Sequence, residues 1–413
     1  MPKQSFSFGY FLATIATSNL AMGIHKVLYP WLVVGVLHES PSRLGVAQLA
    51  LLLPNLLFIL PGGVVSDRSH RGTWLSLLFL LFLLPLGLLM VAVISGELSF
   101  TMLLLFGITF GSLLAFVQPA RESLLGYAAP ELMHQAVAKV MATQFIAQGI
   151  GFLIAGQLGN LSLPELLAIQ IVIFVLSSIL IKRSHPLPKQ QPEELADRAE
   201  VETKSVKQTL LELGDGLQLF RDDKGLMHLL LIVFATGFLA FGVYLVGMPL
   251  IAREFYNGGA ELYAALQVVF SLGIVSANLG VMKQAKLNAK PGRLMVVSFL
   301  LRGSLVGVIA LVPSLWLLFP VVYVWGFFSG LSMTLGRTIL HNQVSHAMRS
   351  RAASVYQLCL LAGAPLGAWV CGLTIEGIGL SSAFVLIAGA TLLVSVLTAV
   401  FSPLWHLKAV RSA

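Results

Sequence analysis

Three titratable side chains lie deep inside apolar stretches of this sequence, where they could bind an ion or carry a proton. Lys26 and His25 are adjacent in the apolar run 8–36, and Arg302 lies in the apolar run 293–312. A helix rises about 1.5 Å per residue, so Lys26 is about 24 Å along its run and Arg302 about 13 Å along its own. Ionisable groups at such depth face a partner or a water-filled cavity.

The two cations predict an electropositive path for a substrate with a carboxylate, catecholate or phosphate group. The alternative is that Lys26 and Arg302 extend to the membrane interface or pair with backbone carbonyls. His25 titrates near neutrality, which makes it a candidate for proton coupling, although it could equally be a polar wall residue. Glu122 is the other candidate, because it is the one acid well inside the apolar runs.

The elements that must position these residues are membrane-spanning helices. Of the 413 residues, 57% are hydrophobic and only 11% are charged, which excludes an ordinary soluble protein of this length. A spanning helix needs about 20 apolar residues, and the backbone inside lipid must bond to itself. The sequence therefore predicts an all-α membrane protein with twelve transmembrane helices. The expected spans are 8–36, 44–66, 73–96, 100–126, 134–158, 163–181, 225–252, 259–282, 293–312, 314–340, 351–374 and 380–401.

A long hydrophilic stretch divides the chain into two halves of six spans. We expect an N-terminal six-helix bundle at 1–183, a cytoplasmic central loop at 184–224 and a C-terminal six-helix bundle at 225–413. Apolar residues at helical spacing between Val206 and Phe220 predict an amphipathic helix in the loop, in place of a wholly flexible linker. An internal repeat with an offset of 216 residues relates the halves and predicts pseudo-symmetric bundles. Its matching pairs are Arg121 and Arg337, Gly151 and Gly367, and Gly156 and Gly372.

The distribution of lysine and arginine predicts the orientation. If both termini are cytoplasmic, the 26 basic residues lie at the inner side except for Lys26, Arg302, Arg43 and Arg253. Such an asymmetry is typical of cytoplasmic loops, so the net charge of +8 is better explained by topology than by nucleic-acid binding. We also expect the first run to be a retained span rather than a removed signal peptide.

The segment that joins the second and third spans, Gly63-Val-Val-Ser-Asp67-Arg68-Ser-His-Arg71, resembles the loop motif of the major facilitator superfamily. Three further stretches are similar to the bacterial drug and siderophore exporter branch, which includes the enterobactin exporter and macrolide efflux pumps. They are Gln118–Glu122, Gln148–Gly156 and Asn19–Trp31. The resemblance covers essentially the whole chain, and it implies export from a bacterial inner membrane by rocker-switch alternating access.

The resemblance also implies a conformational latch in the loop motif. Asp67 is expected near Arg351, where unpaired N–H groups and the dipole at a helix start favour an anion. A charged turn that only sets the topology is the alternative. The expected latch residues are Gly63, Asp67, Arg68, Arg71, Arg121, Glu122 and Arg337.

The sequence departs from the exporter branch at one position. Members of the branch often carry an acid four residues before the first-span cation, and here that position is Met22. This departure weakens the inference of antiport through a first-span acid. The residues expected to bind substrate or line its path are Asn19, Met22, Lys26, Tyr29, Asn55, Gln144, Gln148, Tyr244, Gln267, Arg302, Trp325 and Gln357. Uncharged amides in spans also commonly bond neighbouring helices.

Glycines at regular spacing in both halves predict close helix packing. They are Gly149, Gly151, Gly156, Gly363, Gly367 and Gly372. The sequence has no phosphate-binding G-x-x-x-x-G-K-[ST], no H-E-x-x-H and no G-x-S-x-G, so we expect neither an ATP-driven pump nor an enzyme.

We expect a monomeric secondary transporter without a cofactor, metal site or nucleic-acid partner, coupled to protons or another ion. Its substrate would be a small amphipathic or anionic organic compound, which we expect it to export. A lysophospholipid or other lipid transporter is the first alternative. The second alternative is a membrane sensor or scaffold that transports nothing.

Overall fold

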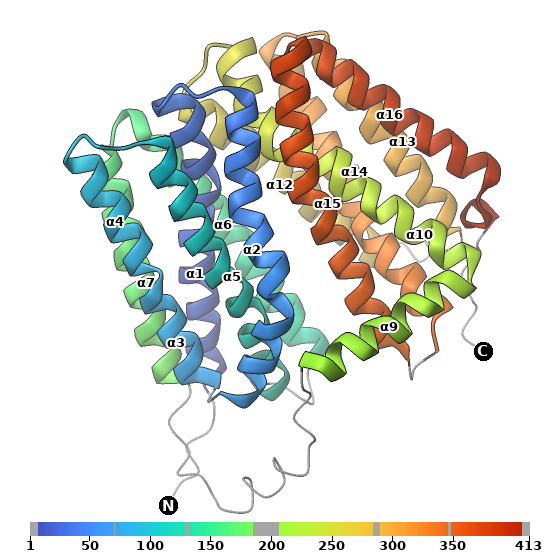
Figure 1. Ribbon diagram of the computed structural model, residues 1–413, viewed down its shortest axis with the longest axis horizontal. Helices are drawn as coiled ribbons and strands as arrows, with labels where there is room; N and C mark the ends of the chain where they lie inside the picture. The colour runs from blue at the N-terminus through green and yellow to red at the C-terminus, as the bar shows by residue number, and fades with distance from the viewer. Residues whose placement is uncertain are drawn as a thin grey trace, which may run out of the picture. The chain divides into compact units, whose positions relative to one another are not determined.

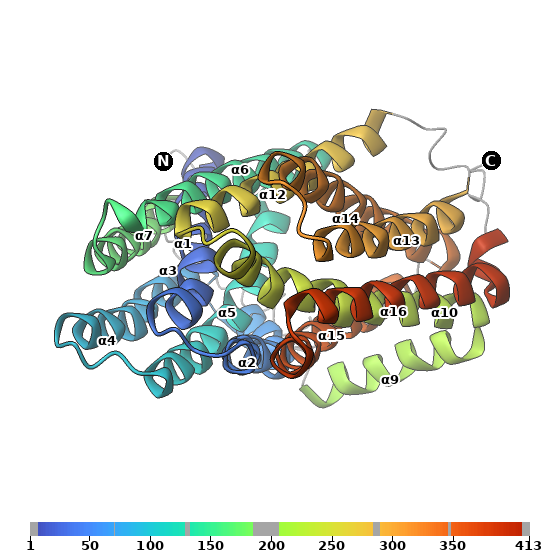
Figure 2. The same cartoon turned by 90° about the horizontal axis from the view of Figure 1, so that it is seen from above.

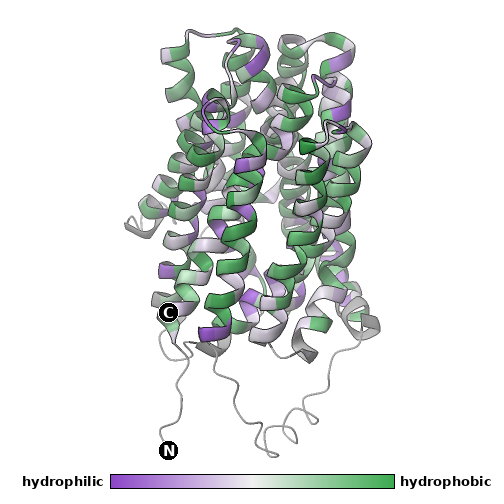
Figure 3. Ribbon diagram, turned by 90° about the vertical axis from the view of Figure 1, so that its left-hand side faces the viewer, coloured by the Kyte–Doolittle hydropathy of each residue, from purple (hydrophilic) through white to green (hydrophobic). Residues whose placement is uncertain are grey.

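The computed structural model of the chain describes residues 7–69, 71–128, 133–184, 206–283, 290–345 and 348–406. The regular secondary structure in these ranges is helical (Figure 1). Within them, eleven helices from Pro41 onward are long and apolar enough to cross a membrane. They are preceded by α1 (Phe8–Trp31), which has 24 residues. Figure 3 shows that hydrophobic residues predominate along the helices, as expected for helices in lipid.

The chain forms two compact units, and the first comprises Met1–Tyr29 and Ala50–Thr209. Its elements, some of which extend past these limits, are α1, α2 (Pro41–Arg68), α3 (Arg71–Leu81), α4 (Leu83–Ile94), α5 (Phe100–Ala128), α6 (Met133–Ala155), the 3-10 turn η2 (Gly156–Gly159) and α7 (Leu163–Ser184). The expected third span is thus formed by α3 and α4 together, which are interrupted at Phe82.

Aromatic rings and small hydroxyl groups hold the first unit together. Phe82 packs between α5 and α7, with its ring centroid 4.6 Å from that of Phe110 and 4.8 Å from that of Phe174. The hydroxyls of Ser76 and Ser178 lie 2.7 Å apart and link α3 to α7. Such small polar pairs are a common means of joining helices where lipid removes the hydrophobic driving force.

The second unit comprises Pro30–Leu49 and Leu210–Ala413. Its first elements after the central loop are α9 (Val206–Asp222), α10 (Lys224–Ala235), η3 (Thr236–Ala240), η4 (Val243–Gly247), α11 (Met248–Leu250) and η5 (Ile251–Phe255). They are followed by α12 (Ala260–Lys283), α13 (Pro291–Ala310), α14 (Leu315–Gln343), α15 (Arg349–Ile378), α16 (Leu380–Phe401) and η8 (Pro403–His406). The unit also takes in the π-helical η1 (Leu32–Val36) and the start of α2.

Close backbone contacts organise the second unit. Helices α12, α14 and α13 lie in a row, and α13 also packs against α16 (Figure 2). Gly330 of α14 lies so close to α12 that an added Cβ would be 2.8 Å from the carbonyl oxygen of Ile274. Real Cβ atoms essentially never approach a heavy atom within 3.0 Å, so this pair of helices depends on the glycine.

The seventh span is a continuous helical segment from Lys224 to Phe255 that contains three π-helical stretches, η3, η4 and η5. Pro249 has no N–H to donate, which removes one regular helical hydrogen bond from this region. Isolated π-helical turns are frequently found at functional sites. This span supplies Thr236 and Tyr244 to the site considered below.

Helix α9 covers the stretch for which the sequence predicts an amphipathic helix. Phe220 is completely buried in the core of the second unit, whereas Leu211 and Leu217 are exposed. Gly216 packs on the first turn of α15, where an added Cβ would be 3.0 Å from the carbonyl oxygen of Arg351 (Figure 1). The helix is therefore anchored to the start of α15 along one face.

Candidate functional site

Lys26 occupies an unusual place in α1. Between Phe11 and Val34 it is the single exposed residue, and Met22, one turn earlier, is half-buried. A lipid-facing helix looks different, because α4 exposes large apolar side chains such as Leu84 and Leu88. Lys26 is therefore an exposed cation that does not belong to a stripe of exposed apolar residues.

His25, next to Lys26, points into the aromatic interior of the first unit. Its ring centroid lies 3.9 Å from that of Phe110, 5.5 Å from that of Tyr29 and 5.8 Å from that of Phe106. The ring is buried, and its Nε2 has no hydrogen-bond partner among the described residues. His25 is thus a packing residue with one unused polar atom.

Two of the other polar residues expected in the first unit bond to helix backbones. Asn19 is buried and donates to the carbonyl oxygen of Ile15 at 2.8 Å. The hydroxyl of Tyr29 is buried and donates to the carbonyl oxygen of Leu103 at 3.1 Å. Gln148 is buried, whereas Asn55 and Gln144 are half-buried.

Arg302 is buried inside the second unit, with 2% of its surface exposed. Its guanidinium donates to the hydroxyl of Thr236 at 3.0 Å and lies 4.9 Å from the centre of the Phe299 ring. Its Nε has no hydrogen-bond partner among the described residues. Arg302 and Lys26 therefore differ: one cation joins two helices of the second unit, and the other is exposed.

Because Arg302 is buried, we expect its replacement to change the free energy of unfolding. Arg302→Ala should lower the free energy of unfolding by about 2–4 kcal/mol, because it leaves a cavity and an unpaired Thr236 hydroxyl. Arg302→Met should stay within about 1 kcal/mol of the native chain or exceed it, because an apolar side chain of similar volume replaces an incompletely paired buried charge. Thermal unfolding of the purified variants measures both. A methionine variant less stable than the alanine variant would contradict this reading.

Tyr244, Gln267 and Trp325 form a polar and aromatic group in the second unit. The amide nitrogen of Gln267 donates to the Tyr263 hydroxyl at 2.9 Å. The Phe270 ring lies between Tyr244, at 4.8 Å, and Trp325, at 5.0 Å. Buried Oε1 of Gln267 and Nε1 of Trp325 have no hydrogen-bond partner among the described residues. These two atoms retain the capacity to bond a ligand or a water molecule.

Gln357 is half-buried on α15. Its expected role in substrate binding stays a prediction.

The expected latch residues are described only in part. The side chains of Asp67, Arg68 and Arg71 lie outside the described part of the structure. Gly63 has open space around it, whereas an added Cβ on the preceding Gly62 would be 2.7 Å from the carbonyl oxygen of Ala115. The tight glycine of this segment is therefore Gly62.

Two of the other charges expected in the latch have local partners. Arg121 donates to Gln144 at 3.2 Å, and Glu122 accepts from Gln118 at 3.0 Å. Arg337 is exposed. At the start of α15, Arg351 pairs with Asp215 of α9 at 3.1 Å.

The glycines fall into two classes. An added Cβ on Gly151 would collide with the carbonyl oxygen of Leu20 and lie 2.9 Å from the Cα of Gly23, whereas one on Gly149 would meet nothing within 4 Å. In the second unit, an added Cβ on Gly363 would lie 2.7 Å from the carbonyl oxygen of Phe234. In each unit, therefore, its first spanning helix packs against its fifth at glycine.

Two contacts were not singled out from the sequence. Thr236, the partner of Arg302, is an ordinary span threonine without a distinguishing pattern. The contact between Glu376 and the start of α2 could have been suspected, because Ser40-Pro41 is a typical helix start and Glu376 is an acid in the last turn of another helix.

Comparison with known proteins identifies relatives of the fold. A sequence model of the Major Facilitator Superfamily matches residues 6–293. No curated protein matches the sequence significantly. Three similar solved structures are between 14% and 15% identical to this chain.

The first of these structures is a mutant of the nucleoside transporter NupG, with a TM-score of 0.74, which covers 96% of this chain and 100% of that one. The second is a bacterial homologue of the human lysosomal transporter Spinster, inward-facing and occupied, with a TM-score of 0.70 and coverage of 98% and 97%. The third is a POT family transporter in complex with a thioalcohol-conjugated peptide, with a TM-score of 0.71 and coverage of 96% of both chains. At this identity the similarity establishes the fold alone.

Proposed function

Because this chain belongs to the Major Facilitator Superfamily, and is therefore a multi-pass secondary transporter and not an enzyme, we propose that it exports a small amphipathic compound with an anionic group. We further propose rocker-switch alternating access in a bacterial inner membrane, with both termini cytoplasmic and the monomer as the working unit. The exporter assignment is supported by the stretches Gln118–Glu122 and Gln148–Gly156.

The observation that carries the anionic substrate is the exposure of Lys26. Placing a charged ammonium group in the middle of a span costs free energy unless the group meets water or an anion. Its helix exposes no other residue between Phe11 and Val34, and we propose that this side chain meets the anionic group of the substrate. Arg302 is engaged with Thr236, and we assign it a structural role.

We propose that the second unit also offers binding chemistry for a small molecule. Tyr244, Phe270 and Trp325 offer aromatic faces, and Gln267 and Trp325 each keep an unused polar atom. Binding sites for small molecules combine apolar walls with a few polar groups in this way. The similar structures include a nucleoside transporter and a peptide-bound transporter, so the same fold serves different substrate classes.

The test of substrate class is a binding screen with matched pairs. Purified protein is mixed with 2-naphthoate or its neutral amide, and with 1-naphthyl phosphate or neutral 1-naphthol. A ligand raises the apparent melting temperature in proportion to the logarithm of its concentration above the dissociation constant. We expect the anion of each pair to stabilise the protein more. Stabilisation by lysophosphatidylglycerol alone would favour a lipid transporter, and equal shifts within each pair would reject the anionic substrate.

We propose Glu122 rather than His25 as the proton-coupling group. Glu122 is exposed, whereas His25 is enclosed by three aromatic rings. In vesicles, Glu122→Gln should abolish the stimulation of transport by a pH gradient, while His25→Phe, which preserves the ring stack, should keep it. Naphthyl phosphate flux at graded pH differences measures this. Full stimulation in the Glu122 variant would exclude Glu122, and loss in the His25 variant alone would assign coupling to the histidine.

The conformational latch at the far end of α2 also remains our proposal. We expect Asp67, supported by Arg68 and Arg71, to engage the start of α15, where a helix N-terminus favours an anion. Reversing the charge with Asp67→Arg should impair transport, and unimpaired flux would argue for a topological role only.

A further inference from the structure

The connection between α1 and α2 packs on α15 within the second unit. We call the segment Pro30–Leu49 the hairpin tip; it clusters with the second unit although the rest of α1 and α2 clusters with the first. An added Cβ on Gly372 of α15 would collide with the carbonyl oxygen of Pro41 and lie 3.2 Å from the Cα of Gly45. An added Cβ on Gly45 would be 2.8 Å from the carbonyl oxygen of Ala368. The two backbones are thus in direct contact.

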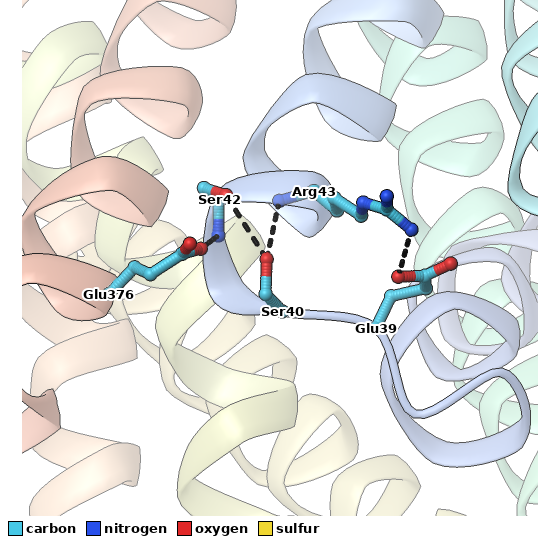
Figure 4. Close-up of polar contacts among 5 residues, drawn as sticks. All are labelled: Glu39, Ser40, Ser42, Arg43 and Glu376. Atoms are coloured by element: carbon cyan, nitrogen blue, oxygen red, sulfur yellow. Dashed lines mark hydrogen bonds and ion pairs between the residues drawn. The ribbon is translucent and has the colours of Figure 1, made fainter.

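The backbone N–H groups at the start of α2 donate partly to a residue outside this helix (Figure 4). Pro41, the first helical residue, has no N–H. The N–H of Arg43 donates to the hydroxyl of the capping Ser40 at 3.4 Å. The N–H of Ser42 donates instead to the carboxylate of Glu376, at 2.9 Å. A residue of α15 therefore completes the cap of α2.

Glu376 is badly placed for its own helix. It lies in the last turn of α15, where the helix dipole disfavours an anion, and α15 ends two residues later at Ile378. The start of α2 offers the opposite polarity, because its N–H groups point outward. The position of Glu376 is therefore electrostatically favourable only while the hairpin tip is docked on α15.

Glu39 gives an instructive contrast on the same segment. Its carboxylate pairs with Arg43, four residues later, within the hairpin tip itself (Figure 4). This ion pair joins two residues of the tip, so we expect docking to change it less than the Glu376 contact. The tip thus carries one carboxylate contact with α15 and one within itself.

We propose that Glu376 is a latch residue that holds the hairpin tip on α15 in one state of the transport cycle and releases it in the other. This inference rests on the alternating-access cycle proposed above. It gives α2 and α15 reciprocal contacts: an acid at the end of α15 caps the start of α2, and Asp67 near the end of α2 is expected to meet the start of α15. When the tip is released, water bonds to the Ser42 N–H and to the Glu376 carboxylate. Breaking the contact in each cycle therefore costs little free energy.

The latch is tested by thiol labelling of Ala368→Cys in a chain whose two native cysteines are replaced by alanine. Ala368 is completely buried beneath Gly45, so labelling by a maleimide reports release of the tip. The measurement uses purified protein in lipid nanodiscs, where both faces are accessible. We expect Glu376→Gln to label about three- to tenfold faster, as loss of an anion at a helix start implies. Glu39→Gln should change the rate less than twofold.

A second pair of variants tests docking by steric means. Gly372→Ala should speed labelling more strongly than Glu376→Gln, because its methyl group displaces the tip. Gly377→Ala lies in the same helix with nothing within 4 Å of the added atom and should leave the rate unchanged. Equal rates in the Glu376 and Glu39 variants would overturn the latch. The experiment needs no substrate or flux, so its failure is distinguishable from failure of the proposed function.

Discussion

Lys26→Ala should weaken the binding of 2-naphthoate by about 10- to 100-fold and leave the binding of 2-naphthamide nearly unchanged. The reason is that a hydrogen bond to a charged group contributes about 1.5–3 kcal/mol, and every 1.4 kcal/mol corresponds to a tenfold change in affinity. The side chain is exposed, and thermal unfolding of the variant checks that its removal does not destabilise the fold. Calorimetric titration of each ligand against the native chain and Lys26→Ala measures the ratio of the two dissociation constants.

The conservative variant provides the control for this experiment. Lys26→Arg keeps the charge and the donors, so most of the affinity for the anion should return. An equal loss for the anion and the amide would mean that Lys26 shapes the path rather than recognising charge. No loss for either ligand would remove Lys26 from the site.

Gly151→Ala adds a single methyl group but should strongly disturb the packing of α1 against α6. Its methyl group would collide with the carbonyl oxygen of Leu20 and come within 2.9 Å of the Cα of Gly23, so α1 and α6 must move apart. Overpacking of this kind costs about 1–3 kcal/mol. We expect the apparent melting temperature to fall by about 3–10 °C and transport to slow, because the helix that carries Lys26 is displaced.

Gly149→Ala is the matched control, two residues away on the same helix. Nothing lies within 4 Å of its added methyl group, and alanine is the better helix former. It should match the native melting temperature or exceed it. An equal fall in melting temperature for both variants would show that α6 itself, and not its contact with α1, is sensitive to substitution.

The fold was largely predictable because spanning length and hydropathy are direct consequences of the bilayer. The glycine offset between the halves also anticipated their similar internal packing. Spacing could not tell Gly149 from Gly151, since the direction in which a glycine faces depends on a neighbour from elsewhere in the chain. The same limit applies to Gly63, where Gly62 makes the close contact.

The sequence predicts how far along its helix each candidate residue lies, but not the direction in which its side chain points. Counting residues along a helix places both Lys26 and Arg302 well inside their spans, yet one is exposed and the other is buried against Thr236. Tyr29 was expected near substrate because it is polar and aromatic, whereas its hydroxyl bonds the carbonyl oxygen of Leu103. Which face of a span meets the path is decided by helix packing, which a single sequence does not encode locally.

The most direct test of the central claim is flux of 1-naphthyl phosphate in proteoliposomes with an imposed pH gradient, because the charged ester crosses lipid slowly by itself. We expect gradient-stimulated flux with the native chain and a rate reduced at least tenfold with Lys26→Ala. We also expect Lys26→Arg to restore most of the rate. Flux that equals protein-free vesicles for every anionic probe, or that is identical in the native chain and Lys26→Ala, would contradict the claim.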